Sequence, residues 1–159
     1  MVLKNIPLSF VLILLFVSAC DSTKKTENNY VQYVNPLIGT DFTGNTYPGA
    51  QVPFGMVQLS PDNGLPGWDR IAGYFYPDST IAGFSHTHLS GTGAGDLYDV
   101  SFMPVTLPYR EAPQPLGIYS SFSHDDESVS AGYYQVLLKD YGIHVELTAT
   151  ERCGIQRYT

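Results

Sequence analysis

Glycine and proline recur every few positions through the middle of this chain, from Pro36 to Pro115. Glycine raises the entropic cost of ordering a helix, and proline removes a backbone donor and breaks the helical turn. Few windows are therefore long enough for a helix of about ten residues, and apolar residues show almost no helical spacing. The same spacing of glycine and proline is compatible with short strands joined by turns. The sequence predicts an all-β domain, an antiparallel β-sandwich, over residues 30–159.

The clearest strand lies near the end of the chain, at residues 143–150. Apolar side chains alternate there with polar ones and share one face: Ile143, Val145, Leu147 and Ala149. This period of two predicts a half-buried strand. Residues 130–139, rich in Tyr, Val and Leu, precede it, and residues 140–142 (Asp-Tyr-Gly) join the two segments. We expect an antiparallel hairpin with a short turn.

Four shorter segments upstream have strand composition and are separated by turn residues: 55–59, 71–76, 81–85 and 98–105. Residues 114–126 are expected to form a surface loop or an edge segment. Residues 151–159 again have strand composition, without a turn or a polar tail. A sheet cut at that point would leave unpaired backbone groups, so we expect the natural protein to continue. The chain contains no internal repeats.

The first residues have the pattern of a targeting signal, which is removed and contributes nothing to a core. Lys4 precedes a largely apolar stretch, whose unbroken run at residues 10–17 is shorter than the roughly 20 residues of a membrane span. Small residues then precede Cys20. This lipobox predicts a lipoprotein signal peptide at residues 1–19, lipidation of Cys20, and an exported, membrane-anchored lipoprotein of the periplasm or cell surface. An ordinary secretory signal is the alternative. Residues 20–29 are expected to form a polar tether.

Charge and cysteine content exclude several classes of partner and site. The net charge is −7, whereas nucleic-acid binding requires clustered Lys and Arg. Beyond Cys20 only Cys153 remains, so no internal structural disulfide forms. With Val145 and Ile155 nearby, we expect Cys153 to be a small buried apolar side chain. The 12 Tyr, 8 Phe and 1 Trp suit sugar binding, but tyrosine is also common in strands.

Residues 81–99 contain the highest density of side chains that could bind a ligand or take part in catalysis. His86 and His88 would project from one face of a strand, and a zinc site would need Asp96 or Asp99 as a third ligand. The glycine-rich residues 90–95 could approach a phosphate, but they lack the Lys and Ser/Thr of a P-loop. A serine hydrolase is disfavoured because no Gly-x-Ser-x-Gly elbow occurs. Isolated motifs of this kind have low specificity.

Several segments, considered together, resemble glycoside hydrolase family 92, the calcium-dependent exo-acting α-mannosidases. They follow the family's order and span nearly all of the chain after the tether: residues 33–40 (Tyr-Val-Asn-Pro-Leu-Ile-Gly-Thr), 48–56 (Pro-Gly-Ala-Gln-Val-Pro-Phe-Gly-Met), 58–62 (Gln-Leu-Ser-Pro-Asp), 81–93 (Ile-Ala-Gly-Phe-Ser-His-Thr-His-Leu-Ser-Gly-Thr-Gly) and 147–152 (Leu-Thr-Ala-Thr-Glu-Arg). The signal peptide and lipobox fit the same family.

The resemblance implies a two-domain glycosidase in which this chain is the N-terminal β-sandwich and an (α/α)6 barrel is absent. The family's catalytic acid, catalytic base and most of its calcium ligands lie in that barrel. The full enzyme would hydrolyse terminal α-mannosides of glycans with inversion, and this fragment would be inactive alone. Its expected partners are mannose-containing glycans, its own C-terminal catalytic domain and, through the lipid anchor, a membrane. No metal ligand or catalytic residue is assigned in this chain.

The sandwich of this family contributes loops to the substrate pocket. Trp68, in the glycine-flanked loop that contains residues 67–70, is the first candidate, because an indole ring stacks on a sugar face. The weaker candidates for hydrogen bonds to hydroxyls are His86, His88, Ser90 and Asp96. Two other hypotheses remain open: a surface lipoprotein that captures glycans without hydrolysing them, and a zinc hydrolase that uses His86 and His88.

Overall fold

A computed structural model of the chain describes residues 29–109, 111–113 and 116–159. The signal peptide, Cys20 and all of the tether except Asn29 lie outside these residues. Within them no α-helix occurs, and the helical turns are short 3-10 segments: η1 (Tyr30–Tyr33), η2 (Trp68–Arg70) and η3 (His124–Asp126). No helix in these ranges combines the length and the apolar character needed to cross a bilayer.

The largest sheet has four antiparallel strands in the order β11-β10-β9-β8. They are β8 (Glu127–Ser130), β9 (Tyr133–Leu138), β10 (Ile143–Ala149) and β11 (Gly154–Tyr158). Consecutive strands are neighbours throughout, so the sheet is a meander built from local hairpins. The predicted β9–β10 hairpin is confirmed, with Val145 paired to Val136 and Leu147 to Tyr134.

A second sheet contains three antiparallel strands in the order β1-β2-β4. They are β1 (Ala50–Gln51), β2 (Gln58–Asp62) and β4 (Gly83–Ser85). Two short ribbons complete the strand set: β3 (Thr80–Ile81) pairs with β7 (Ser120–Ser121), and β5 (Glu111–Ala112) pairs with β6 (Gly117–Ile118).

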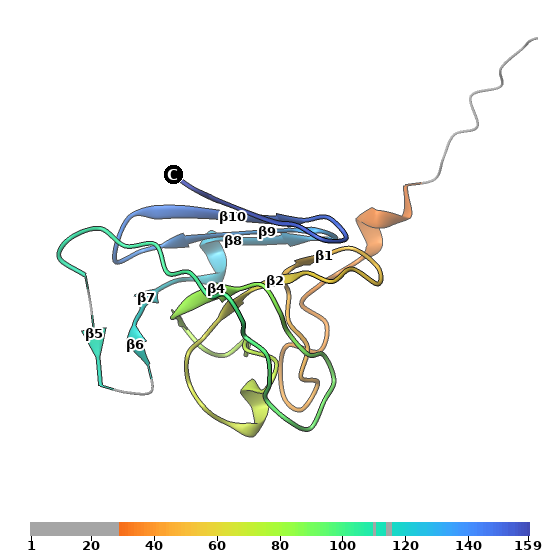
Figure 1. Cartoon of the computed structure of the whole chain (residues 1–159), viewed down its shortest axis with the longest axis horizontal. Helices are drawn as coiled ribbons and strands as arrows, with labels where there is room; N and C mark the ends of the chain where they lie inside the picture. The colour runs from red at the N-terminus through yellow and green to blue at the C-terminus, as the bar shows by residue number, and fades with distance from the viewer. Residues whose placement is uncertain (1–28, 110, 114–115) are drawn as a thin grey trace, which may run out of the picture.

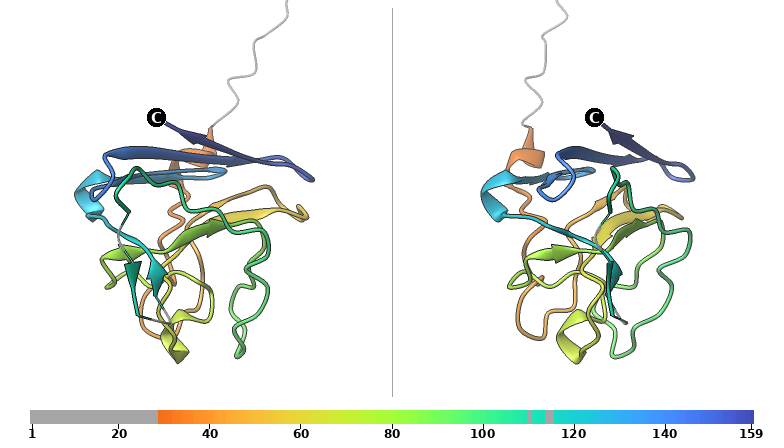
Figure 2. Two further views of the ribbon diagram at one scale, coloured as in Figure 1. Left: turned by 60° about the vertical axis from the view of Figure 1, so that its left-hand side comes forward. Right: turned by 90° about the vertical axis from the view of Figure 1, so that its left-hand side faces the viewer.

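The four-stranded sheet lies over the three-stranded sheet as a second layer (Figures 1 and 2). The alternating apolar residues of β9 and β10 point into the space between the layers, where they meet Leu59 of β2 and Phe84 of β4. Val136, Val145 and Leu147 are fully buried there. This layered, all-β architecture confirms the predicted antiparallel sandwich, and burial of apolar surface between the sheets is its main source of stability.

All four of the shorter predicted strands differ from the structure. Residues 71–76 form turns, because Ile71 has helical dihedrals and Gly73 is left-handed at φ +88°. Residues 98–105 form no strand and contribute only an isolated bridge from Phe102 to Phe84. The strand predicted at 55–59 begins instead at Gln58, since the backbone turns at Phe54, which has φ +59°. The predicted strand at 81–85 is divided between β3 and β4, which pair with different partners.

Two further expectations are corrected by the tertiary structure. Of the two alternatives for residues 114–126, a surface loop or an edge segment, the described part (116–126) is not a simple surface loop: it contains β6 and β7, each in a two-stranded ribbon, and η3, and Ser120 and Phe122 are buried. Cys153 is exposed. It lies in the turn between β10 and β11, where its backbone N–H bonds to the Thr150 hydroxyl at 3.1 Å. The turn carries Cys153 out of the sheet, so its apolar neighbours in sequence do not cover it.

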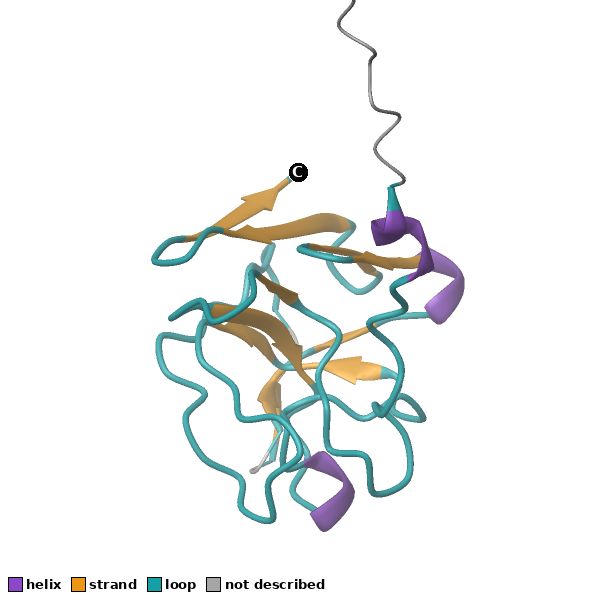
Figure 3. Cartoon of the chain, turned by 90° about the vertical axis from the view of Figure 1, so that its right-hand side faces the viewer, coloured by secondary structure: helices purple, strands orange, loops and turns teal. Residues whose placement is uncertain are grey.

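Long loops occupy the side of the three-stranded sheet that faces away from the four-stranded sheet (Figures 2 and 3). The turn after β2 carries η2, and the segment after β4 runs beside it. These two segments, residues 62–73 and 86–101, form the candidate site.

Candidate functional site

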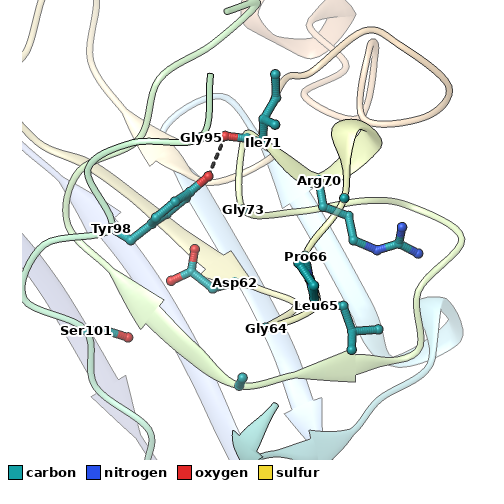
Figure 4. Close-up of a pocket in the computed structure, with 12 residues that line it drawn as sticks. Asp62, Gly64, Leu65, Pro66, Arg70, Ile71, Gly73, Gly95, Tyr98 and Ser101 are labelled. Atoms are coloured by element: carbon teal, nitrogen blue, oxygen red, sulfur yellow. Dashed lines mark hydrogen bonds between the residues drawn. The ribbon is translucent and has the colours of Figure 1, made fainter. Parts of the chain in front are cut away.

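A pocket of about 480 Å³ lies between the two loop segments (Figure 4). Its walls come from three parts of the chain. The end of β2 and the turn that follows supply Asp62, Gly64, Leu65, Pro66, Gly67, Arg70, Ile71 and Gly73. The residue between β3 and β4 is Ala82, and the segment after β4 supplies Gly95, Tyr98 and Ser101. The volume is within the range of small-molecule sites, about 300–1,000 Å³.

The turn after β2 is fixed by Asn63, which is fully buried. Its side-chain amide donates to the Thr80 carbonyl at 2.6 Å, and its side-chain carbonyl accepts from the Phe75 backbone N–H at 2.5 Å. Its own N–H donates to the Gly73 carbonyl at 2.8 Å. One buried side chain therefore closes both ends of the turn that forms one wall of the pocket.

Arg70, at the end of η2, forms a two-pronged ion pair with Asp78. Nε lies 2.6 Å from Oδ2 and Nη2 lies 2.5 Å from Oδ1. These hydrogen bonds to Asp78 raise the pKa of the Arg70 guanidinium. The guanidinium also lies 4.6 Å from the ring centroid of Phe75, a cation–π contact. Arg70 therefore holds η2 in place, and its charge at the pocket wall is balanced by Asp78.

The segment after β4 doubles back on itself. The Tyr98 N–H donates to the Thr87 carbonyl at 2.9 Å, and an isolated bridge joins His88 to Leu97. Leu97, Tyr98 and Val100 all have left-handed backbones, at φ +78°, +59° and +54°. Such conformations are costly for residues other than glycine and persist only where the surroundings enforce them. This backbone turns the Tyr98 ring over the pocket.

Tyr98 joins the two loop segments, because its hydroxyl donates to the Ile71 carbonyl (Figure 4). Burial raises the pKa of the Tyr98 phenol, and the negative charges of Asp62 and Asp96 raise it further. The phenol is therefore a neutral donor whose bond closes one end of the pocket.

Asp62 supplies the acidic group of the pocket, and His88 lies behind it. The His88 Nε2 atom is 2.9 Å from Oδ1 of Asp62 and 3.1 Å from the Ser85 hydroxyl, while Nδ1 is 2.7 Å from the Gln58 carbonyl. The His88 side chain is fully buried, whereas 15% of the Asp62 side chain is exposed. His88 thus fixes the carboxylate without reaching the pocket surface.

The two histidines do not share a site. His86 bonds through Nδ1 to the Val100 carbonyl at 2.8 Å and borders a separate hollow of about 260 Å³, together with Phe102 and Tyr158. Residues 29–109, 111–113 and 116–159 contain no group of three His, Cys, Asp or Glu side chains placed to hold a metal ion. The predicted zinc site, with His86, His88 and an aspartate as its three ligands, is therefore not formed among the described residues.

The remaining predicted residues lie around the loop tip. The Trp68 side chain is 61% exposed, and a Cβ atom on Gly93 would be 3.3 Å from its ring. Ser90 and Asp96 are exposed on the same segment as Gly93, and Oδ1 of Asp96 accepts from the Leu97 N–H at 2.8 Å. The structure brings Trp68 close to Gly93 at the loop tip, whereas His86 borders the second hollow. Contact of any of these residues with a sugar stays a prediction.

Comparison with known proteins identifies the family. The profile of the Glycosyl hydrolase family 92 N-terminal domain matches residues 33–159. The chain belongs to glycosyl hydrolase family 92. The family suggested by the sequence motifs is thereby confirmed, and the described sandwich is its N-terminal domain.

Two solved family 92 structures, both from Bacteroides thetaiotaomicron, resemble the chain. An α-mannosidase in complex with mannoimidazole is 46% identical, with a TM-score of 0.77, over 83% of this chain and 18% of that one. An inverting mannosidase is 31% identical, with a TM-score of 0.64, over 82% of this chain and 18% of that one. An uncharacterized secreted glycosidase of Arthroderma benhamiae is 30% identical over 142 residues, 83% of this chain and 17% of its own length. The chain thus spans less than a fifth of the length of each of these three relatives.

Two residues that shape this pocket, Asp62 and Tyr98, are not among the site residues predicted from the sequence. Asp62 ends a segment that carries the resemblance to the family, but its position after Pro61 suggested only a turn. Tyr98 was included in a predicted strand. Neither residue has a local pattern that reveals its partner, because both partners come from distant parts of the chain.

Proposed function

We propose that this chain is the N-terminal part of an exported α-mannosidase that hydrolyses terminal α-mannosides of glycans with inversion. The 46% identity with a family 92 α-mannosidase, over 83% of this chain, is the observation that carries the proposal. The chain spans 18% of that enzyme. This coverage supports the proposal that the whole protein is larger and that a C-terminal domain supplies the catalytic groups.

Inverting hydrolysis requires a carboxylic acid that protonates the leaving oxygen and a carboxylate that activates water, about 6.5–9.5 Å apart. Asp62 is the acidic lining residue of the described pocket, and it is engaged by His88. We therefore assign the catalytic acid and base to the C-terminal domain, and this chain by itself is inactive. Calcium, which would bind sugar oxygens, is likewise assigned to ligands outside the described residues.

The role proposed for this domain is to form one wall of the sugar site. Trp68 offers an exposed ring for stacking, and Ser90 and Asp96 lie beside it on the neighbouring loop. His86 borders the second hollow and is proposed to contact a glycan there or to fix the boundary with the C-terminal domain. The two loop segments, residues 62–73 and 86–101, and the catalytic domain would together enclose the mannoside.

The test compares the full-length protein with the 159-residue chain on an α-1,2-linked mannobiose, with and without calcium chelation. We expect hydrolysis only by the full-length protein, loss of activity on chelation, and a β-configured mannose product by NMR. The matched α-glucoside is the control substrate and should not be cleaved. Release of mannose by the 159-residue chain, or an inactive full-length protein, would refute the division of labour.

Export and anchoring are proposed from the N-terminal segment, and the secreted relative supports export. Cys20 would carry the lipid. Metabolic labelling with a radioactive fatty acid should label the wild-type protein, and Cys20→Ser should abolish the label, whereas Cys153→Ser should retain it. Equal labelling of wild-type protein and Cys20→Ser would contradict lipidation at Cys20.

A glycan-binding surface lipoprotein is the second candidate. The exposure of Trp68 beside a preformed pocket favours it, because binding modules present aromatic rings in this way. This function predicts measurable affinity of the protein for mannan by calorimetry in the absence of any hydrolysis, and Trp68→Ala should remove that affinity.

A further inference from the structure

The carboxylate of Asp62 has one oxygen occupied and one oxygen free. Oδ1 is held by His88 Nε2 at 2.9 Å. Among the hydrogen bonds of residues 29–109, 111–113 and 116–159, none engages Oδ2. In Figure 4 the carboxylate lies between Tyr98 and the turn that contains Gly64, within the pocket. A carboxylate oxygen accepts more than one hydrogen bond when ionised, so Oδ2 of this pocket-lining residue has unused capacity.

The surroundings hold this carboxylate in one position. A Cβ atom on Gly73 would lie 2.5 Å from Oδ1 of Asp62 and 3.1 Å from both the His88 and Tyr98 rings. Three side chains therefore converge on a position that only glycine fits, and Gly73 also has φ +88°. The His88 ring packs in turn against Tyr47 and Tyr98, with centroids 5.0 and 5.8 Å away. Little reorganisation is needed before Asp62 accepts a donor.

Two of the three other polar side chains that line the pocket are already committed, and the third is the hydroxyl of Ser101. The Tyr98 hydroxyl donates to Ile71, and Arg70 is paired with Asp78. The remaining walls are mostly apolar, from Leu65, Pro66 and Ile71. An apolar pocket with one preformed carboxylate suits a neutral ligand that carries hydroxyl donors on an apolar ring.

We propose that the free oxygen of Asp62 accepts a hydrogen bond from a hydroxyl of a glycan bound in this pocket, with His88 as the positioning residue. Asp62 is then a substrate-binding residue of this domain. This assignment rests on the proposed function, since it takes the ligand to be the α-mannoside substrate. An anionic ligand is disfavoured because it would lie against the carboxylate, and a bound cation is disfavoured because no second acidic side chain lines the cavity.

The experiment measures kcat and KM of the full-length protein for the α-1,2-linked mannobiose, with melting temperature as a second readout. Asp62→Ala removes the acceptor, and we expect KM to rise about 10- to 100-fold, the effect of losing a hydrogen bond to a charged group. Asp62→Asn keeps the size and one acceptor, so its KM should rise less. In both variants kcat should change little.

Glu127→Gln is the matched control. Glu127 is also a buried carboxylate paired with a histidine, its Oε2 atom 2.7 Å from Nδ1 of His124, but it lines no described pocket. This variant should lower the melting temperature and leave KM within about twofold. If Asp62→Ala fails to fold, Ala82→Leu provides an independent test, because it adds side-chain volume at another lining residue and leaves Asp62 itself unchanged; KM should again rise.

His88→Asn tests the positioning role. We expect KM to rise and kcat to stay, and the double variant with Asp62→Asn should be no worse than the more severe single variant, since both act through one carboxylate. An unchanged KM in Asp62→Ala or Ala82→Leu, with an active wild-type enzyme, would overturn this inference alone. Such a result would indicate that the pocket is filled by the C-terminal domain. An inactive wild-type enzyme would instead overturn the proposed function and this assignment together.

Discussion

Gly93 lies beside the edge of the Trp68 indole ring: a Cβ atom on Gly93 would be 3.3 Å from Cη2 of the indole. The missing side chain lets the loop tip reach the ring, while 61% of Trp68 remains exposed. The contact joins the two loop segments at a second point, in addition to the bond from Tyr98 to Ile71. The indole therefore lies close to the loop tip at Gly93 and remains largely accessible to a ligand.

This arrangement predicts a binding role for the indole. In the full-length protein, Trp68→Ala should raise KM for the mannobiose by about three- to tenfold, the usual worth of an aromatic stacking contact. Trp68→Phe should recover most of the loss, because it restores a ring. The proposed role of Trp68 is contradicted if KM is the same in Trp68→Ala and wild type.

Glu127 should contribute strongly to stability. Its side chain is 2% exposed, and it accepts hydrogen bonds from the hydroxyls of Tyr74 and Tyr134 at 3.0 and 2.6 Å and pairs with His124 at 2.7 Å. Glu127→Ala leaves these three groups without their acceptor. We expect the free energy of unfolding to fall by about 3–5 kcal/mol in denaturant titrations. Glu151→Ala, at an exposed position, should change it by less than about 0.5 kcal/mol.

The buried tyrosines should make the fold sensitive to alkali. Burial raises the pKa of Tyr134 and Tyr74, and the charge of Glu127 raises both further; burial alone raises the pKa of Tyr47 to about 12. The unfolded value is about 10. The folded state therefore holds these protons more tightly, so its stability is complete below about pH 10 and falls as the pH rises through the folded values.

An ultraviolet titration of tyrosinate measures this effect alongside circular dichroism. The buried Tyr74 and Tyr134 should ionise only as the protein unfolds, so their tyrosinate absorbance and the loss of the circular dichroism signal should appear together. Ionisation of all tyrosines near pH 10 in a folded protein would contradict the buried network around Glu127.

Asn63 should be required for the pocket wall. Asn63→Ala leaves the Thr80 carbonyl and the Phe75 N–H without their buried partners, and each orphaned group costs about 1–3 kcal/mol. We expect a loss of about 2–3 kcal/mol in the free energy of unfolding, measured with urea. Asn35→Ala, at an exposed position, is the control and should cost little. Equal effects of the two substitutions would show that the side-chain bonds of Asn63 are not what stabilises the turn.

Elements whose contacts join residues close in the chain are predictable from the sequence. The β9–β10 hairpin follows from alternation along each strand and a glycine in the turn, and Gly142 indeed has φ +64°. The backbone conformation of the loops is not predictable in this way. Residues 98–105 have the composition of a strand, but contacts with Thr87 and Ile71 hold part of them in a left-handed backbone. Composition does not encode such contacts.

The sequence by itself determined the class of fold, the family and the main hairpin, because periodicity, glycine and proline placement and motif order are properties of neighbouring residues. Only the tertiary structure decided that Asp62, His88 and Tyr98 meet around Gly73, that His86 and His88 part, and that Cys153 is exposed. The physical reason is that side-chain partners are chosen by the packing of distant segments. His86 and His88 are two residues apart, yet His86 bonds to the Val100 carbonyl and His88 bonds to Asp62.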